Sequence, residues 1–276
     1  MKGVILNEIA KFIFAPRRWL PILLAAFFLG WANTGLISAI AINQQVGINI
    51  WDAYFLVMNN RIDLTVVLLL AIAFSVCDVV TNDYLTNYHW LVLTRRPSRF
   101  KWWLAKLIMV FSIALLALFA TLFSTFLWGL IREIPLSFTP SQFAMGEFDG
   151  WRYFPVLASD ASVFHLVIGM TLLAALGLGS IISCFVLLSL FLAKPFAIIG
   201  LVFFWTLLDF SLTGHVFFWS RYLSPSMKMM LMTHWPREDI FFPYLMPPLW
   251  TSVAFFVFII SAVCILGWRR IKEADF

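Results

Sequence analysis

Six long apolar runs divide the chain and restrict the folds that it can adopt. A helix needs about 20 apolar residues to cross roughly 30 Å of hydrocarbon, and in lipid its backbone must form its hydrogen bonds within the segment. Apolar residues make up 62% of the 276 residues and charged residues only 12%, which is too apolar for a soluble domain. The sequence therefore predicts an all-α integral membrane protein with six transmembrane helices. The runs are residues 19–42, 64–80, 104–131, 163–193, 196–212 and 249–268, of which the second and fifth are short for a full crossing.

The Lys and Arg residues are divided unevenly between the two sets of run ends. One set holds 13 of them, including Lys2 and Lys272. The other set, on the expected outer side, holds 6, which are Arg61, Arg132, Arg152, Arg221, Lys228 and Arg237. Because short cytoplasmic loops carry the excess of Lys and Arg, we expect a multi-pass protein of the cytoplasmic membrane with both termini in the cytoplasm. The net charge of +5 does not gather on one soluble face, so no nucleic-acid partner is expected.

Three segments outside the runs are expected to have structure of their own, within a single transmembrane domain of residues 1–276. Residues 1–18 contain Ile5, Ile9 and Phe12 at helical spacing, with Glu8 and Lys11 on the other, polar side. This pattern predicts an interfacial amphipathic helix that ends at Pro16. Residues 81–103 form a cytoplasmic loop. Residues 213–248 are rich in aromatic residues and prolines, and such a segment predicts short helices that dip into the outer leaflet before the last span.

No sequence motif for catalysis or nucleotide binding is present. The chain has no G-x-x-x-x-G-K-[ST], H-E-x-x-H or C-x-x-C pattern, so we expect no enzyme activity, metal site or cofactor in this chain. Residues 177–180 faintly resemble the serine motif of intramembrane proteases, with Gly179 in the place of the serine. Packing explains them better, because Ala175, Gly179 and Ser183 recur every four residues and form a small-residue face.

Two polar residues inside apolar runs, Asn33 and Asp209, are candidates for a substrate path. Asp209 lies roughly 20 Å along its run from Pro195. An ionisable group at such a depth is expensive and usually faces a cavity or a partner. His165 is one candidate partner for Asp209, and a water-accessible acid near the outer interface is the alternative.

The loop after the second run has an ordered pattern, with N-D-Y-L-T-N-Y at residues 82–88 and L-V-L-T-R-R-P-S-R at residues 91–99. It resembles the cytoplasmic loop of ABC-2 type permeases, the membrane subunits of ATP-binding-cassette exporters. That family often shows an acidic patch, a Leu-Leu-x-Arg-Pro-x-Ser-Arg-like run and then a Lys. The matching residues are Leu91, Leu93, Arg95, Arg96, Pro97, Ser98, Arg99 and Lys106. The chain lacks the usual Gly before the Leu pair and has no residue between Pro97 and Ser98.

The resemblance implies a transport mechanism. Residues 83–93 would form a coupling helix that docks on a separate ATPase subunit, which would hold the ATP and Mg. Two permease subunits, identical or homologous, would pass an amphipathic or hydrophobic peptide, lipid or drug-like molecule between their first, second and fifth spans. The ATPase contacts that the resemblance implies are Asp83, Tyr84, Thr86, Tyr88, Leu91, Arg95, Arg96 and Arg99.

Two other functions are compatible with the sequence. The first is a non-transporting membrane partner, such as a sensor or assembly subunit. The second is an intramembrane enzyme, which would need a polar catalytic cluster at one depth. Copurification separates them, because a permease should bring down an ATPase subunit. Membrane lipid is an expected partner in each case, since arginine pairs attract anionic headgroups.

Overall fold

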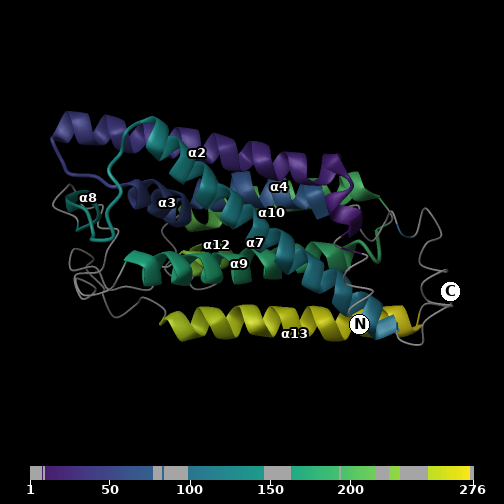
Figure 1. Cartoon of the computed structure of the whole chain (residues 1–276). Helices are drawn as coiled ribbons and strands as arrows, with labels where there is room; N and C mark the ends of the chain where they lie inside the picture. Colours follow the sequence, from purple (N-terminus) through teal and green to yellow (C-terminus); the bar gives the residue numbers. More distant parts are fainter. Residues whose placement is uncertain are drawn as a thin grey trace.

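The structure is a computed structural model that describes residues 8, 10–76, 83, 99–145, 163–192, 194–214, 224–230 and 248–273. All of the regular structure in these residues is helical, as predicted (Figure 1). The elements are α2 (Pro16–Gln44), α3 (Ile50–Asn59), η1 (Ile62–Leu68), α4 (Leu69–Val76), α7 (Arg99–Ile131), α8 (Gln142–Met145), α9 (Val163–Leu188), α10 (Pro195–Gly214), α12 (Pro225–Met229) and α13 (Leu249–Glu273).

Among the described residues, four helices are long and apolar enough to cross a membrane, namely α2, α7, α9 and α13. At 1.5 Å per residue, even the 25 residues of α13 exceed the roughly 30 Å of a hydrocarbon core. A fifth span results if α3 and the helix formed by η1 and α4, which meet at a bend of 75°, count as one. The apolar part of α10, Phe196–Ser211, is shorter. The short run 64–80 thus overlaps η1 and α4, the short run 196–212 overlaps α10, and α3 lies before the second run.

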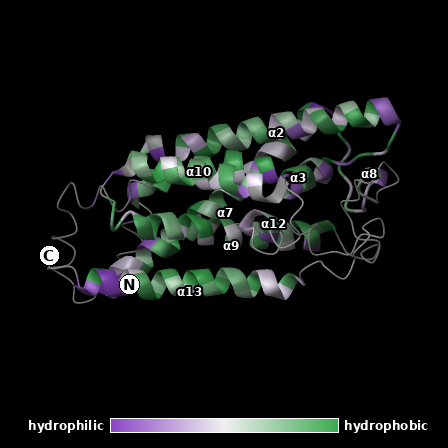
Figure 2. Cartoon of the chain, turned by 180° about the vertical axis from the view of Figure 1, so that it is seen from behind, coloured by the Kyte–Doolittle hydropathy of each residue, from purple (hydrophilic) through white to green (hydrophobic). Residues whose placement is uncertain are grey.

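The long helices run roughly side by side, with α2 and α13 on opposite sides and α7 crossing between them (Figure 1). Helix α7 packs against both α2 and α9, and α13 packs against α9. The start of α2, the start of α7 and the end of α13 lie at one end of the bundle. Apolar residues occupy the middle of α13 and hydrophilic residues its C-terminal end (Figure 2).

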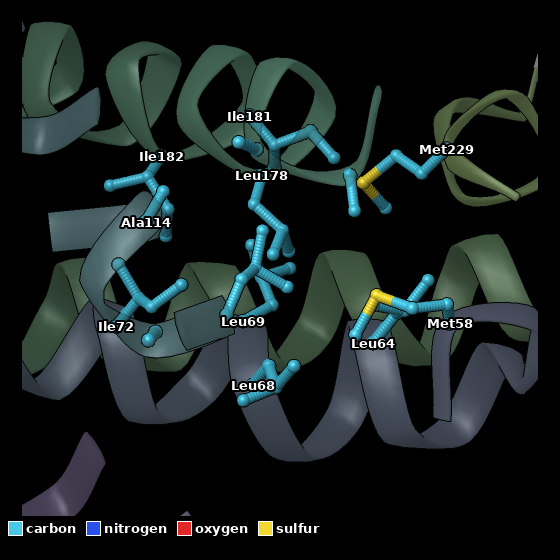
Figure 3. Packing of buried hydrophobic residues seen from close by; sticks show 14 of the residues in the cluster. Met58, Leu64, Leu68, Leu69, Ile72, Ala114, Leu178, Ile181, Ile182 and Met229 are labelled. Carbon is cyan, nitrogen blue, oxygen red and sulfur yellow. The ribbon is translucent and has the colours of Figure 1, made fainter. Parts of the chain in front are cut away.

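Helix α9 lies at the centre of the core. Its residues Leu178, Ile181 and Ile182 approach Leu69 and Ile72 of α4, Ala114 of α7 and Met229 of α12 (Figure 3). The predicted small-residue face of α9 is confirmed as a packing surface, because Ala175, Gly179 and Ser183 are all buried. A Cβ added to Gly179 would collide with the ring of Phe111 on α7.

The short helix α12 lies in the segment 213–248, where the sequence predicts re-entrant helices. Met229 packs its side chain so closely over Gly177 of α9 that a Cβ there would collide with it. Ser226 and Met229 are buried. The apolar character of this segment is therefore used in part to dock α12 on the centre of the bundle.

The polypeptide before α2 is also helical in part. Glu8 and residues 10–13 are helical, and the helix ends before Ala15. The predicted stop at Pro16 is close to this end, but Pro16 itself is the first residue of α2. Proline is favoured at the first helical position, where its missing N–H would have no partner in the helix.

Candidate functional site

A closed ring of four charged side chains connects three segments that are far apart in the sequence. Lys106 Nζ lies 2.5 Å from Glu8 Oε2 and 2.5 Å from Asp83 Oδ2. Lys11 Nζ lies 3.1 Å from Glu8 Oε1 and 3.1 Å from Asp83 Oδ1. We call Glu8, Lys11, Asp83 and Lys106 the buried charge ring. It joins the N-terminal helical residues and Asp83, which is itself helical, to α7.

The charges alternate around this ring, so each acid contacts two lysines and each lysine contacts two acids. Glu8, Asp83 and Lys106 are buried, and Lys106 also lies 5.4 Å from the ring of Trp102. A buried ion is tolerated only when it is paired and hydrogen-bonded. Removing one partner of a buried pair costs about 3–5 kcal/mol. The ring therefore holds Asp83 firmly on α7 as long as all four residues are present.

Sequence reasoning identified two members of this ring. Asp83 and Lys106 belong to the loop pattern, whereas Glu8 and Lys11 were placed only on the polar side of the N-terminal helix. Their three-residue spacing puts them on one helix face. Nothing in the sequence shows that this face turns toward α7.

The other predicted ATPase contacts divide into two groups. Tyr84, Thr86, Tyr88, Leu91, Arg95 and Arg96 lie outside the described residues. Arg99 is described and begins α7, so the last five residues of the predicted loop 81–103 are helical. Its Nη1 donates to the backbone oxygens of Ile271 (3.2 Å) and Lys272 (3.3 Å) at the end of α13. A cation there complements the negative end of the helix dipole.

A second polar cluster forms where the chain breaks between α3 and η1. Arg61 Nη2 lies 3.3 Å from Asp209 Oδ2 and also donates to the backbone oxygen of Asp209. Arg61 Nε donates to Ser226 Oγ (2.9 Å), and Ser224 Oγ donates to Asp209 Oδ1 (2.8 Å). We call Arg61, Asp209, Ser224 and Ser226 the Arg61 junction. It fastens α10 and the start of α12 to the bend.

This geometry changes the interpretation of Asp209. Its side chain is buried and ion-paired, so it is not the water-accessible acid that the sequence left as an alternative. The candidate partner was His165, but the ring of His165 packs edge-on against Phe164, with centroids 6.3 Å apart. The cation beside Asp209 is Arg61, which the sequence had placed only among the outer cations.

Asn33, the other substrate-path candidate, also contacts the bent segment. Its Nδ2 donates to Asp63 Oδ2 (2.9 Å) and to the backbone oxygen of Leu29 (3.0 Å), and both Asn33 and Asp63 are buried. Asp63 lies two residues after Arg61, in the π-helix η1. The structure thus links Asn33 of α2 and Asp209 of α10 to the same short segment, and π-helical turns are frequent at functional sites.

Within the described residues, no group of three or more His, Cys, Asp or Glu side chains is placed to hold a metal ion. Cys184 and Cys264 are free thiols. The polar groups described above are charged, hydroxyl and amide side chains that bind one another. Their arrangement suits positioning of helices.

Comparison with known proteins gives a family match over most of the chain. The family model described as "Protein of unknown function (DUF2705)" matches residues 21–276. The matched part includes Arg61, Asp83, Lys106 and Asp209 and begins after Glu8 and Lys11. No curated protein and no solved structure matches the chain.

Proposed function

The chain belongs to the DUF2705 family, and we propose that it is the permease subunit of an ATP-driven exporter of the ABC-2 type. It moves an amphipathic or hydrophobic substrate across the cytoplasmic membrane, and a separate ATPase subunit hydrolyses the ATP. The observation that carries the proposal is the fixation of Asp83, the first residue of the expected coupling helix, in the buried charge ring.

The buried charge ring can transmit a movement of the coupling helix to the helices of the bundle. A coupling helix works only if a push on it moves the spans instead of bending the loop. Asp83 is bound to Lys106 of α7 and, through Lys11, to the N-terminal helix. Movement of the docked ATPase would therefore shift α7 and the N-terminal helix together, as a rigid-body change between packed states.

The proposed topology has six spans, with the bent α3–η1–α4 segment as the second and α10 as the fifth. Both termini face the cytoplasm in this topology. Two observations support it: the start of α2 and the end of α13 lie at the same end of the bundle (Figure 1), and the excess of Lys and Arg belongs to that set of ends.

The proposed substrate path runs between α2, the bent segment and α10 of two permease subunits, identical or homologous. Polar contacts already connect these elements, because Asn33 binds Asp63 and Arg61 binds Asp209. A path that opens between them must break or exchange at least one of these contacts. The Arg61 junction is therefore the candidate for the part of the path that changes between the closed and open states.

Crosslinking tests the proposal. Cys77, Cys184 and Cys264 are replaced by Ser, and one Cys is introduced by Tyr84→Cys or Leu91→Cys. The control is Phe138→Cys, an exposed position in the segment that follows the C-terminal end of α7, away from Arg99 at its start. We expect Tyr84→Cys and Leu91→Cys to crosslink to a nucleotide-hydrolysing subunit in native membranes, with a yield that changes when ATP is added. Phe138→Cys should not crosslink to it.

Two results would overturn the proposal. One is crosslinking of the loop only to proteins that do not hydrolyse nucleotides, which would favour the sensor or assembly subunit. The other is labelling of Leu91→Cys by a membrane-impermeant thiol reagent added outside intact cells. The loop would then be on the wrong side of the membrane for any ATPase.

A further inference from the structure

The C-terminal end of α13 is cationic and is fixed against the start of α7. Arg269, Arg270 and Lys272 are exposed in its last turns. Arg99 donates to the backbone oxygens of Ile271 and Lys272. Next to it, the ring of Phe100 packs edge-on against Trp268, with centroids 5.4 Å apart. These contacts make the two helix ends one corner of the bundle (Figure 1).

The connection between α9 and α10 completes this corner. The guanidinium carbon of Arg270 lies 5.1 Å from the ring centre of Phe191, just after α9. Lys194 follows three residues later, directly before α10, and is exposed. We call Arg269, Arg270, Lys272, Phe191 and Lys194 the α13 corner. Among the described residues in the last turn of α13, Glu273 is the one acidic residue near these four cations in the sequence.

Exposed apolar side chains stand close to these cations in the sequence, with Phe196 two residues after Lys194 and Leu266 one helical turn before Arg270. Phe191 is 58% exposed, Phe196 is 83% exposed and Leu266 is 52% exposed. The guanidinium group of Arg270 lies over the ring of Phe191. The rest of this ring is exposed, so one aromatic side chain offers both a cation and an apolar surface. Arg side chains commonly bury their stems along apolar surface and keep the charged head in the polar layer. The α13 corner therefore has charged groups next to exposed apolar side chains. Figure 2 shows the corresponding change from hydrophobic to hydrophilic residues toward the C-terminal end of α13.

We propose that the α13 corner binds an anionic phospholipid of the cytoplasmic leaflet. The guanidinium groups of Arg269 and Arg270 pair with the lipid phosphate, which matches their planar donor geometry. Lys272 and Lys194 add positive charge at the headgroup level. The acyl chains lie along Phe191, Phe196 and Leu266. An amphiphile with a charged head and apolar tails fits this surface better than a water-soluble partner, because the exposed apolar side chains would otherwise remain uncovered.

The proposed site is separate from the proposed transport function. It involves neither the buried charge ring nor the Arg61 junction, so it can be present or absent whichever function the chain has. It also differs from a general attraction of cations to the membrane. A diffuse attraction depends only on the number of charges, whereas this site depends on which cations remain and on the ring of Phe191.

Native mass spectrometry of the purified full chain, with any bound subunit, tests the site. The probes are phosphatidylglycerol and phosphatidylcholine of identical acyl chains, mixed equally in detergent micelles. The variant is Arg269→Gln/Arg270→Gln. The control is Arg132→Gln/Arg152→Gln, which removes the same charge from the other set of run ends. Each exposed ion pair between a guanidinium group and the lipid phosphate contributes up to about 1 kcal/mol. We therefore expect the preference for phosphatidylglycerol to fall roughly 30-fold in the variant and to stay within about twofold in the control.

A second variant separates the site from diffuse charge. Phe191→Ala keeps every charge, and we expect it to reduce phosphatidylglycerol retention several-fold, because Arg270 loses the surface on which it lies. Arg270→Lys keeps the charge without the planar guanidinium and should give an intermediate loss, even if the double Gln variant fails to fold. Equal retention of the two lipids by the unaltered chain would overturn the proposal. So would an equal loss in the variant and the control, or no effect of Phe191→Ala.

Discussion

Arg61 and Asp209 form an ion pair across 148 residues of sequence, at the break between α3 and η1. The same arginine donates to the backbone of Asp209 and to Ser226 of α12, and its guanidinium carbon lies 4.8 Å from the ring centre of Phe210. One side chain thus connects the bent segment to α10 and α12. Its position at the break, not inside a straight helix, lets it reach both partners.

Asp209→Asn is expected to destabilise the protein by about 2–3 kcal/mol. The change leaves the Arg61 cation without its carboxylate in an apolar surround. Breaking a fully buried pair costs about 3–5 kcal/mol. We expect a loss no larger than the low end of this range, because the Arg61 side chain is 14% exposed and water can partly solvate it. Thermal unfolding in detergent measures it, with the exposed Arg132→Gln as a control that should change little. An unaltered midpoint in Asp209→Asn would show that the pair does not hold the bend.

The lysines of the buried charge ring should differ in importance. Lys106→Met removes a fully buried cation that faces Glu8 and Asp83, and about 3–5 kcal/mol of stability should be lost with it. Lys11→Met removes the cation that is 27% exposed, where water can partly replace it, so we expect a smaller loss. Thermal unfolding midpoints of the two variants, measured under the same conditions, show which loss of stability is larger. An equal or larger effect of Lys11→Met would contradict the ring geometry.

The sequence predicts the helical elements well because apolar runs in lipid leave the backbone no alternative to a helix. It places α9 as a single helix and identifies Gly179 as a packing residue, since small residues at four-residue spacing have a direct geometric meaning. It also shows that the second and fifth runs are short. It does not predict the 75° bend between α3 and η1, which depends on tertiary contacts such as those of Arg61.

The polar partners are harder to predict, because they are chosen by three-dimensional packing. The sequence identifies Asp209 as a costly buried acid and offers His165 as a candidate partner, because it carries no distance that would point to Arg61 instead. Glu8 and Lys11 gave only a polar helix face. Asp83 and Lys106 were found because a family pattern places an acid and a later lysine in order, and that pattern does not say that the two touch.

The small-residue face of α9 gives a prediction with an internal control. Gly179→Ala should destabilise the protein, because the new methyl group collides with Phe111 and overpacking costs about 1–3 kcal/mol. Gly169→Ala lies on the same helix, where an added Cβ meets nothing within 4 Å. Alanine is favoured over glycine in a helix by up to about 1 kcal/mol, so this variant should be neutral or more stable. Unfolding midpoints that move in the same direction would contradict the predicted difference.

Charge reversal distinguishes a ring from a set of independent pairs. If Asp83 and Lys106 formed an isolated pair, the exchange Asp83→Lys/Lys106→Asp would restore it. In the ring, the exchange places a lysine at position 83 beside Lys11 and an acid at position 106 beside Glu8. Two attractive contacts become repulsive, so we expect the exchanged protein to be no more stable than Lys106→Met.

Reversal of all four residues keeps the alternation and should recover most of the loss. The variant is Glu8→Lys/Lys11→Glu/Asp83→Lys/Lys106→Glu, which leaves the net charge unchanged. Membrane insertion, measured by yield in the membrane fraction, is the control, and it should be similar in all variants because the apolar runs are unaltered. Full recovery by the two-residue exchange would mean that Glu8 and Lys11 do not share the site. Asp83 would then be held by α7 alone, and a force on the loop would not reach the N-terminal helix.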